Sequence, residues 1–159
     1  MNKWTISAIV FGSLLFLALL FRLIFVYFVD NYELGYSFNK FTGSVERLDR
    51  TGYFIANPFE KVIHTIDLRP MQVRIEANNR VLNAKLVQFR EEGLIQFIDL
   101  HGRGDYSPSS TAASGGNFTD IMKCYAYENY GNMNSDSIIE YKYKFIRILS
   151  NTNTANINK

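Results

Sequence analysis

The stretch that decides the fold is TISAIVFGSLLFLALLFRLIFVYFV at residues 5–29, in which 20 of 25 residues are apolar. A membrane span needs about 20 mostly apolar residues, so this stretch is long enough to cross a bilayer with some tilt. Only 47% of the whole chain of 159 residues is hydrophobic, which means that the apolar residues are concentrated here. We therefore expect one transmembrane helix near the amino terminus.

A cleavable signal peptide is the competing interpretation of this stretch. Signal peptides have a shorter apolar region that is followed by small residues at the cleavage site. Here the sequence FVYFV at residues 25–29 continues the apolar block instead. We therefore predict an uncleaved anchor and assign residues 1–29 to a leader and this anchor.

Arg22 is the one charged residue inside the apolar block. If roughly residues 5–24 span the hydrocarbon, Arg22 lies about one turn from the interface, where its long side chain can reach the polar headgroups. Phe25, Tyr27 and Phe28 would then form an aromatic belt at the membrane interface. The alternative is that Arg22 pairs with a charged partner inside a helix bundle.

The flanking charges predict the orientation of the anchor. The short leader carries Lys3 and the amino terminus, whereas the other side begins with Asp30 and Glu33. Because positive charge favours the cytoplasmic side, we expect a cytoplasmic amino terminus and an exported domain, periplasmic if the cell is a Gram-negative bacterium.

The remaining 130 residues are long enough to bury one sizeable core, so we expect one folded domain at residues 30–150. Lys3 and Arg22 are the only charged residues before this region, which leaves 15 basic and 15 acidic side chains in it. A neutral domain argues against nucleic-acid binding by neutralisation of phosphates. The single cysteine, Cys124, rules out an intrachain disulfide.

Short stretches of alternating or β-branched residues, bounded by turn residues, predict a largely antiparallel β domain. A four-residue hairpin signal, Arg90-Glu91-Glu92-Gly93, separates the last two of these stretches. The expected strands lie at residues 34–41, 53–57, 62–68, 71–75, 81–89 and 94–100.

The carboxyl-terminal third is less regular. We interpret residues 102–117 as a flexible loop, because nearly all are small or polar. Residues 118–130 fit a short helix capped by Thr119 or Asp120. The helix would bury Ile121, Met122 and Tyr125 on one side.

Residues 137–149 allow two interpretations. Ser137 and Glu140 have the spacing of a helix capping box, whereas Tyr141, Tyr143 and Phe145 alternate as in a strand. We favour a strand at 141–149, followed by a polar, frayed tail at 151–159. The tyrosines of this third are compatible with packing at a sheet edge or with a protein-contact surface.

The residues that carry chemistry in other proteins are sparse. The only histidines are His64, which alternates with apolar residues in an expected strand, and His101, in a glycine-bearing turn. Neither belongs to a paired metal-binding spacing, and nothing in the sequence brings Cys124 to a histidine as a thiol dyad. We expect no enzyme activity, no cofactor, no metal site and no small-molecule substrate.

Residues 43–75, GSVERLDRTGYFIANPFEKVIHTIDLRPMQVRI, resemble the start of an SPFH (band 7) domain, the module of stomatins, prohibitins, flotillins and the HflK/HflC pair. Members place a hydrophobic anchor first, then a strand, a glycine-bearing turn, a G-x-F segment ending in Pro-Phe, and a V-x-x-x-D-x-R strand. The residues that carry this pattern are Gly52, Phe54, Pro58, Phe59, Asp67 and Arg69.

These motif residues are structural rather than catalytic. Gly52 permits a tight turn, Pro58 stops a strand, and Asp67 and Arg69 share one strand face where they can pair with neighbouring strands. The family continues with a long coiled-coil helix that builds membrane rings, and we expect that helix to be absent because no heptads follow the domain before Lys159. The resemblance fades after residue 80.

We therefore expect an α+β fold, in which a single transmembrane helix precedes a small, mostly antiparallel β SPFH-like domain with one or two short helices. The expected function is that of a non-enzymatic scaffold or modulator of a membrane assembly, such as a membrane protease or a microdomain. Its partners would be the lipid bilayer and further copies, or other SPFH-like or membrane proteins. The alternative is a single-pass subunit or binding module of an envelope complex.

Overall fold

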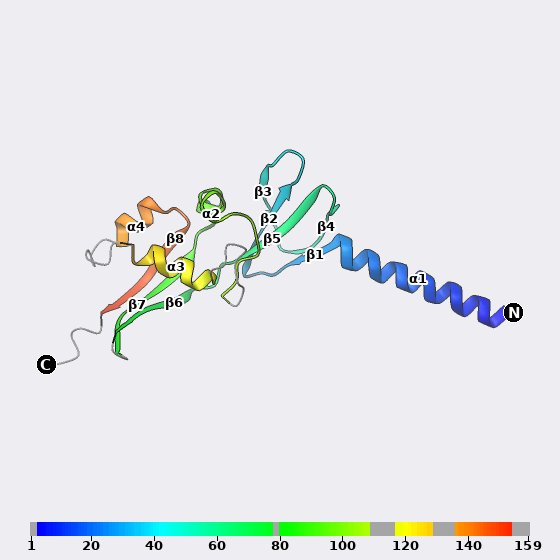
Figure 1. The fold of residues 1–159 in the computed structure, drawn as a ribbon, viewed down its shortest axis with the longest axis horizontal. Helices are drawn as coiled ribbons and strands as arrows, with labels where there is room; N and C mark the ends of the chain where they lie inside the picture. Colours follow the sequence, from blue (N-terminus) through cyan, green and yellow to red (C-terminus); the bar gives the residue numbers. More distant parts are fainter. Residues whose placement is uncertain (1–2, 78–79, 109–116, 129–135, 154–159) are drawn as a thin grey trace.

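The computed structural model describes residues 3–77, 80–108, 117–128 and 136–153, and it is elongated, with helix α1 (Lys3–Phe25) projecting from one end (Figure 1). Residues Ile6–Phe25 of this helix are predominantly apolar, and none of them is buried. By length and composition they can cross a membrane, and a signal sequence near an amino terminus has the same properties. The helix ends at Phe25, four residues before the end of the apolar block.

Strand β1 (Val26–Val29) occupies the end of that block, where the anchor was expected to continue. It pairs in antiparallel fashion with β4 (Gly52–Ile55), and we call these two strands the ribbon. The sequence VYFV consists of β-branched and aromatic residues, which fit a strand well once a partner strand is available. The apolar stretch is therefore divided between a helix and a strand.

A second, three-stranded antiparallel sheet follows in the order β3–β2–β5. The expected strands at 34–41 and 62–68 are confirmed as β2 and β5. Gly43, at the turn between β2 and β3, has a φ of 73°, which glycine adopts readily. The strands are β2 (Glu33–Asn39), β3 (Val45–Arg47) and β5 (Lys61–Asp67).

A third antiparallel sheet has the order β6–β7–β8 and lies at the end of the molecule away from α1 (Figure 1). The expected strands at 71–75 and 81–89 are confirmed as β6 and β7. The register of β7 with β8 shifts at Leu86/Val87, which indicates a bulge. The strands are β6 (Met71–Ala77), β7 (Arg80–Phe89) and β8 (Ile146–Asn153).

The strand predicted at 94–100, with its hairpin at 90–93, is wrong. Glu91–Gly93 forms a 3-10 turn that leads into helix α2 (Leu94–His101). Leu94, Phe97 and Ile98 are buried, and their spacing is that of one helical face rather than of alternation. A Cβ atom at Gly93 would lie 2.1 Å from the backbone nitrogen of Phe145. Only glycine therefore allows the turn to pack this closely against the backbone at Phe145.

The helix predicted at 118–130 is confirmed as α3 (Phe118–Ala126), but its cap is Asn117 rather than Thr119 or Asp120. The side-chain oxygen of Asn117 accepts a hydrogen bond from the backbone N–H of Thr119 at 3.2 Å. Ile121 and Met122 are buried as expected, and Tyr125 is half-buried.

Both interpretations of residues 137–149 are correct in part. Helix α4 (Asp136–Lys142) occupies the first half, and β8 begins only at Ile146, so the strand predicted from residue 141 starts too early. Strand β8 extends to Asn153, which places the first residues of the predicted tail in a sheet. Residues 154–159 of that tail lie outside the described residues.

The predicted loop at 102–117 is described only up to residue 108, and residues 109–116 lie outside the described residues. Its first part is packed rather than free. Tyr106 is 1% exposed, and it makes a parallel bridge with Ile66 of β5. The prediction missed this because a single tyrosine in a polar stretch carries no periodicity.

The hydrophobic core lies between the β6–β7–β8 sheet and the helices, and it includes Leu34, Tyr36 and Ile66 of the second sheet. Phe97 is at its centre, with rings of four other aromatic residues about it. Those residues are Phe89, Tyr106, Phe118 and Phe145. The expected α+β class is confirmed: an apolar helix precedes antiparallel sheets, and the described residues include three short α-helices after α1.

Candidate functional site

Helix α1 continues into the ribbon without a linker. Phe25 is the last residue of α1 and Val26 is the first residue of β1. The backbone N–H of Ala56, directly after β4, donates a hydrogen bond to the carbonyl oxygen of Phe25 at 3.0 Å. This bond ties the last residue of α1 to the segment that follows β4, so the end of the helix is part of the ribbon.

The ribbon has an exposed apolar face. Antiparallel partners lie on the same side of a sheet, so the pairs Val26–Ile55 and Phe28–Tyr53 share one face, which we call the outer face. Phe28 is 56% exposed, Tyr53 65% and Ile55 75%, and the rings of Phe28 and Tyr53 are 5.0 Å apart. All four side chains of this face are apolar or aromatic, which is unusual for a solvent-facing sheet.

The opposite face of the ribbon packs against the second sheet. Val29 is 1% exposed, and a Cβ added to Gly35 of β2 would lie 2.9 Å from the Cγ2 of Val29. Because Gly35 has no side chain, the ribbon can pack closely against the β3–β2–β5 sheet at this point. Because this face is occupied, the outer face is the one available for contacts.

The outer face of the ribbon continues into a groove along α1. Leu19, Arg22 and Leu23 line the helix side of this groove. The ribbon side is lined by Val26, Phe28 and Tyr53. Arg22 is exposed, so the groove combines apolar walls with one positive charge.

The four residues predicted for the membrane interface lie around this junction. Arg22 and Phe28 share the groove, as described above. Phe25 and Tyr27 are half-buried, and the ring of Phe25 stacks on that of Phe21 at 4.8 Å. Tyr27 and Phe28 belong to a strand and not to the helix on which the sequence prediction had placed them.

The first half of the SPFH-like motif builds the other strand of the ribbon and its exit. Gly52 opens β4 with a φ of 109°, and Phe54 lies in β4 with the guanidinium of Arg50 5.5 Å from its ring centre. Pro58 follows β4, and its carbonyl oxygen accepts a hydrogen bond from Lys40. Phe59 is 76% exposed. These residues therefore shape the region next to α1.

The second half of the motif forms an ion pair. Asp67 ends β5 and is 1% exposed, and both of its oxygens accept hydrogen bonds from the Arg69 Nε, at 3.0 and 2.9 Å. Hydrogen bonding to Asp67 raises the pKa of Arg69. The two residues pair with each other, across the end of the strand, rather than with neighbouring strands as expected. Their role in the structure is to close β5 before Pro70.

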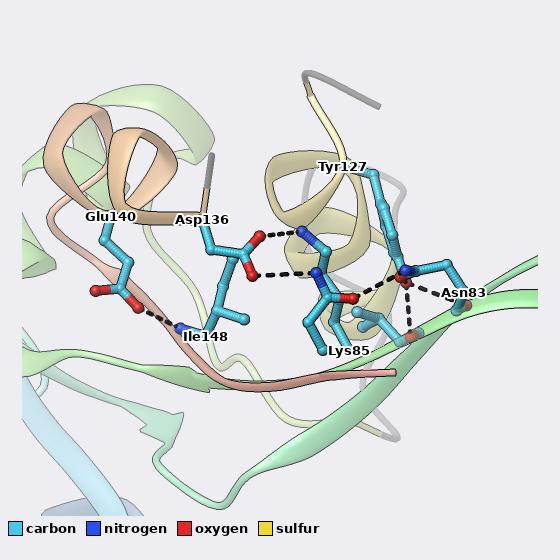
Figure 2. Close-up of polar contacts among 8 residues, drawn as sticks. Asn83, Lys85, Tyr127, Asp136, Glu140 and Ile148 are labelled. Atoms are coloured by element: carbon cyan, nitrogen blue, oxygen red, sulfur yellow. Dashed lines mark hydrogen bonds and ion pairs between the residues drawn. The ribbon is translucent and has the colours of Figure 1, made fainter. Parts of the chain in front are cut away.

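A polar cluster lies between α4 and the third sheet, and Figure 2 shows its contacts. Lys85 of β7 is 5% exposed, and its ammonium group donates to the Oδ1 of Asp136 at the start of α4. Asn151 of β8 donates to the other oxygen of Asp136 at 3.2 Å and accepts from the amide of Asn83 at 2.8 Å. The hydroxyl of Tyr127 donates to the Oδ1 of Asn83 at 2.7 Å.

This cluster joins α3, α4, β7 and β8 through paired polar groups. Each polar side chain in it is bonded to another member of the cluster, as expected for buried polar groups in a folded core. We therefore interpret the cluster as structural. The sequence prediction missed this cluster. Alternation along β7 could have indicated it, because Asn83 and Lys85 lie on the same strand face as Val87 and Phe89, which are buried.

The histidines and the cysteine have different surroundings. The Nδ1 of His64 lies 3.4 Å from the Oδ1 of Asp105, and the interaction with His64 lowers the pKa of Asp105. The Nε2 of His101 lies 2.7 Å from the hydroxyl of Tyr125, and burial lowers the pKa of His101. Cys124 is exposed on α3. Among the residues that the structure describes, no three His, Cys, Asp or Glu side chains gather as a metal site.

The junction of α1 with the ribbon is the candidate functional site, because it combines an apolar helix with an exposed apolar strand pair. Comparison with protein-family models and with curated proteins found no match for this chain.

Proposed function

We propose that this protein is a membrane-anchored, non-enzymatic domain that scaffolds or modulates a membrane protein assembly through lateral packing of neighbouring domains. The observation that carries the proposal is the direct passage from α1 into the ribbon, fixed by the Ala56–Phe25 hydrogen bond. A domain without a flexible linker keeps one orientation toward the bilayer. Such a fixed orientation is useful for assembly in the plane of the membrane.

The length of α1 supports the role of an anchor. Residues Ile6–Phe25 comprise 20 residues, which at about 1.5 Å per residue span about 30 Å, the thickness of the hydrocarbon. Arg22 then lies within one turn of the headgroups, and Phe28 and Tyr53 lie at the depth where aromatic side chains are enriched. The flanking charges favour an exported domain.

Anchoring changes the energetics of association. Domains held at one membrane search two dimensions at a fixed height, so their effective concentration is high and contacts that are weak in solution become sufficient. The resemblance to SPFH domains supports the same function, since that family acts by assembling at membranes. By this resemblance the assembly would contain a membrane protease or form a membrane microdomain.

Mass measurement of the full chain after extraction in mild detergent tests the proposal. We expect a homo-oligomer or hetero-oligomer, and a monomeric chain would rule the scaffold out. Replacing His64, His101 and Cys124 together should leave assembly and cellular function intact, because the proposal gives none of them a catalytic role. Loss of function in this triple variant with assembly unchanged would favour an enzyme.

The orientation has a separate test. Cys124 is exposed on α3, so a membrane-impermeant thiol reagent should label it in intact cells if the domain is exported. The variant Cys124→Ser controls for labelling of other proteins. Labelling only after lysis would reverse the orientation.

The alternative function, a binding subunit of an envelope complex, is favoured by one observation. On α4, at the end of the molecule away from α1, Ile138 is 55% exposed and Tyr141 is 88% exposed (Figure 1). Exposed aromatic and aliphatic side chains of this kind are typical of protein contacts. On this alternative, Ile138→Ser with Tyr141→Ser would reduce the mass of the extracted complex to that of the chain alone.

A further inference from the structure

The backbone groups of the ribbon that face away from its centre belong to four residues. In antiparallel pairs, hydrogen-bonded and non-bonded positions alternate along the strands. Because Ala56 donates to Phe25, the next bonded pairs are Tyr27–Phe54 and Val29–Gly52. The N–H and C=O groups of the remaining residues therefore point outward along the two edges. These residues are Val26 and Phe28 on β1, and Tyr53 and Ile55 on β4.

Both outer edges lack a strand partner within the described part of the chain, where β1 and β4 pair only with each other. Proteins usually protect such edges with charged residues, proline, bulges or a covering segment. The strands VYFV and GYFI contain no charge and no proline, and their register is regular. Neither strand therefore has a charge, a proline or a bulge that would discourage another strand from pairing.

The edge of β5 shows the contrast, because a segment covers it. The N–H of Tyr106 donates to the carbonyl of Thr65 at 2.8 Å, and the N–H of Asp67 donates to the carbonyl of Tyr106 at 2.8 Å. The Oδ1 of Asp105 also accepts a hydrogen bond from the N–H of Thr65, at 2.9 Å. These bonds occupy the positions that an added strand would need.

The outer strands of the other sheets carry protection as well. The N–H of Ile148 in β8 donates to Glu140 of α4 at 2.8 Å, as Figure 2 shows. Strand β3 carries the charged residues Glu46 and Arg47. On β6 the exposed side chains are Gln72, Arg74 and Glu76. The ribbon therefore differs from every other sheet edge that the structure describes.

Anchoring determines which edges of two copies can meet in antiparallel fashion. In every copy α1 enters from the membrane, so β1 runs away from the bilayer and β4 runs back toward it. Two β1 edges would meet in parallel, and so would two β4 edges. The β1 edge of one copy and the β4 edge of the next meet in antiparallel fashion, which is slightly more stable per residue.

We propose that the outer edge of β1 in one copy pairs with the outer edge of β4 in the next, so that ribbons of successive copies form one continuous antiparallel sheet beside the membrane. This pairing rests on the proposed anchored assembly and names the contact that builds it. Val26 pairs with Ile55 of the neighbouring copy, and Phe28 pairs with Tyr53 of that copy. Because the two edges differ, the contact is head-to-tail and produces a ring or an open row.

Crosslinking between two tagged chains tests the pairing. Both chains carry Cys124→Ser; one also carries Phe28→Cys and the other Tyr53→Cys, so each has a single cysteine and any crosslink joins two copies. A thiol crosslinker that spans about one strand spacing, roughly 5 Å, should link the two tags in vesicles. Absence of this product in an assembled sample would overturn the proposal.

The matched control uses Phe28→Cys in both tagged chains. In the proposed sheet these two positions lie two strands apart, about 10 Å, so the short reagent should give little product. A product equal to that of the mixed pair would show that β1 meets β1 and would overturn the head-to-tail arrangement.

A backbone variant provides a second test. Phe28→Pro removes an N–H that points out of the ribbon, whereas Phe28→Ala keeps it. We expect the proline variant to be monomeric with an unchanged circular dichroism spectrum, and the alanine variant to assemble. An assembled proline variant would overturn the proposal; if that variant is unfolded, the crosslinking result decides.

Failure of this inference differs from failure of the proposed function. A wild-type chain that is monomeric in mild detergent and in vesicles overturns both. A wild-type oligomer without the crosslink between positions 28 and 53 overturns only the ribbon pairing and leaves the scaffold function in place.

Discussion

The ribbon and the β6–β7–β8 sheet are both antiparallel, yet they use their apolar residues in opposite ways. The distal sheet buries Val73, Val87 and Phe89 beneath helices. The ribbon leaves Tyr53 and Ile55 exposed beside a helix in which no residue of the apolar span is buried. The same residue types therefore stabilise the fold at one end of the molecule and remain available for contacts at the other.

This difference means that stability and assembly should respond to different substitutions. The distal sheet and its helices contribute the stability of the domain, because burial of apolar surface is the main favourable term in folding. On the proposed assembly, the outer face and edges of the ribbon contribute little to stability and much to association. Each prediction below tests one side of this division, in order of decreasing effect.

The largest loss of stability is expected for Phe97→Ala. Phe97 is fully buried, and its ring makes edge contacts with Tyr106 and Phe145. Removing such a side chain leaves a cavity and costs about 3–5 kcal/mol. Guanidinium titration of the detergent-solubilised full chain, followed by circular dichroism, measures the change. A cost below about 1 kcal/mol, as for a surface position, would show that the distal core is not the stabilising part.

A smaller loss is expected for Asp136→Asn, which leaves the ammonium of Lys85 buried without its carboxylate. Breaking a buried pair costs about 3–5 kcal/mol, and because Asp136 is partly exposed we expect about 2–3 kcal/mol. The double variant Lys85→Met with Asp136→Leu should recover most of this loss. If the double variant is less stable than Asp136→Asn, the pair has a further role in placing α4.

A change on the outer face of the ribbon should leave stability almost unaltered. Ile55 is 75% exposed, so Ile55→Ser should change the free energy of unfolding by no more than about 0.5 kcal/mol. The same guanidinium titration measures this change. Val73→Ser is the destabilised control, because Val73 is only 1% exposed. A loss of several kcal/mol at Ile55 would contradict the division between the two regions.

The smallest effect concerns pH. Burial lowers the pKa of His101 in the folded protein, so the unfolded chain binds a proton more readily. Stability is therefore fully present above the ordinary histidine pKa of about 6.5 and falls as the pH decreases through the lowered value. Unfolding titrations at pH 7.5 and at pH 5 should show a larger loss in the wild type than in His101→Gln. Equal losses would mean that protonation of His101 does not contribute to the pH dependence of stability.

Periodicity accounts for what was predictable in this fold. Strands such as β2 and β5 alternate apolar residues and are bounded by turn residues, and α3 has apolar residues at helical spacing. Residues 94–100 were misassigned because the short apolar run LIQFIDL fits a buried strand as well as a helix, and only the packing of α2 decides that Phe97 faces inward. In the candidate site, Arg22 and Phe28 were predictable from their place at the end of the apolar block, but Tyr53 and Ile55 were not, since their exposure depends on pairing with β1.

The sequence by itself determined that an apolar helix precedes a neutral, mainly antiparallel α+β domain, because hydrophobic length and alternation are local properties of the chain. Only the tertiary structure decided where the helix ends, because the apolar block runs on through Val26–Val29 and these residues form a strand only once β4 supplies the partner. The tertiary structure also buried Lys85 beside Asp136 and covered the edge of β5, whereas no described strand covers the edges of the ribbon. Such outcomes depend on contacts between distant segments, which composition and spacing do not contain.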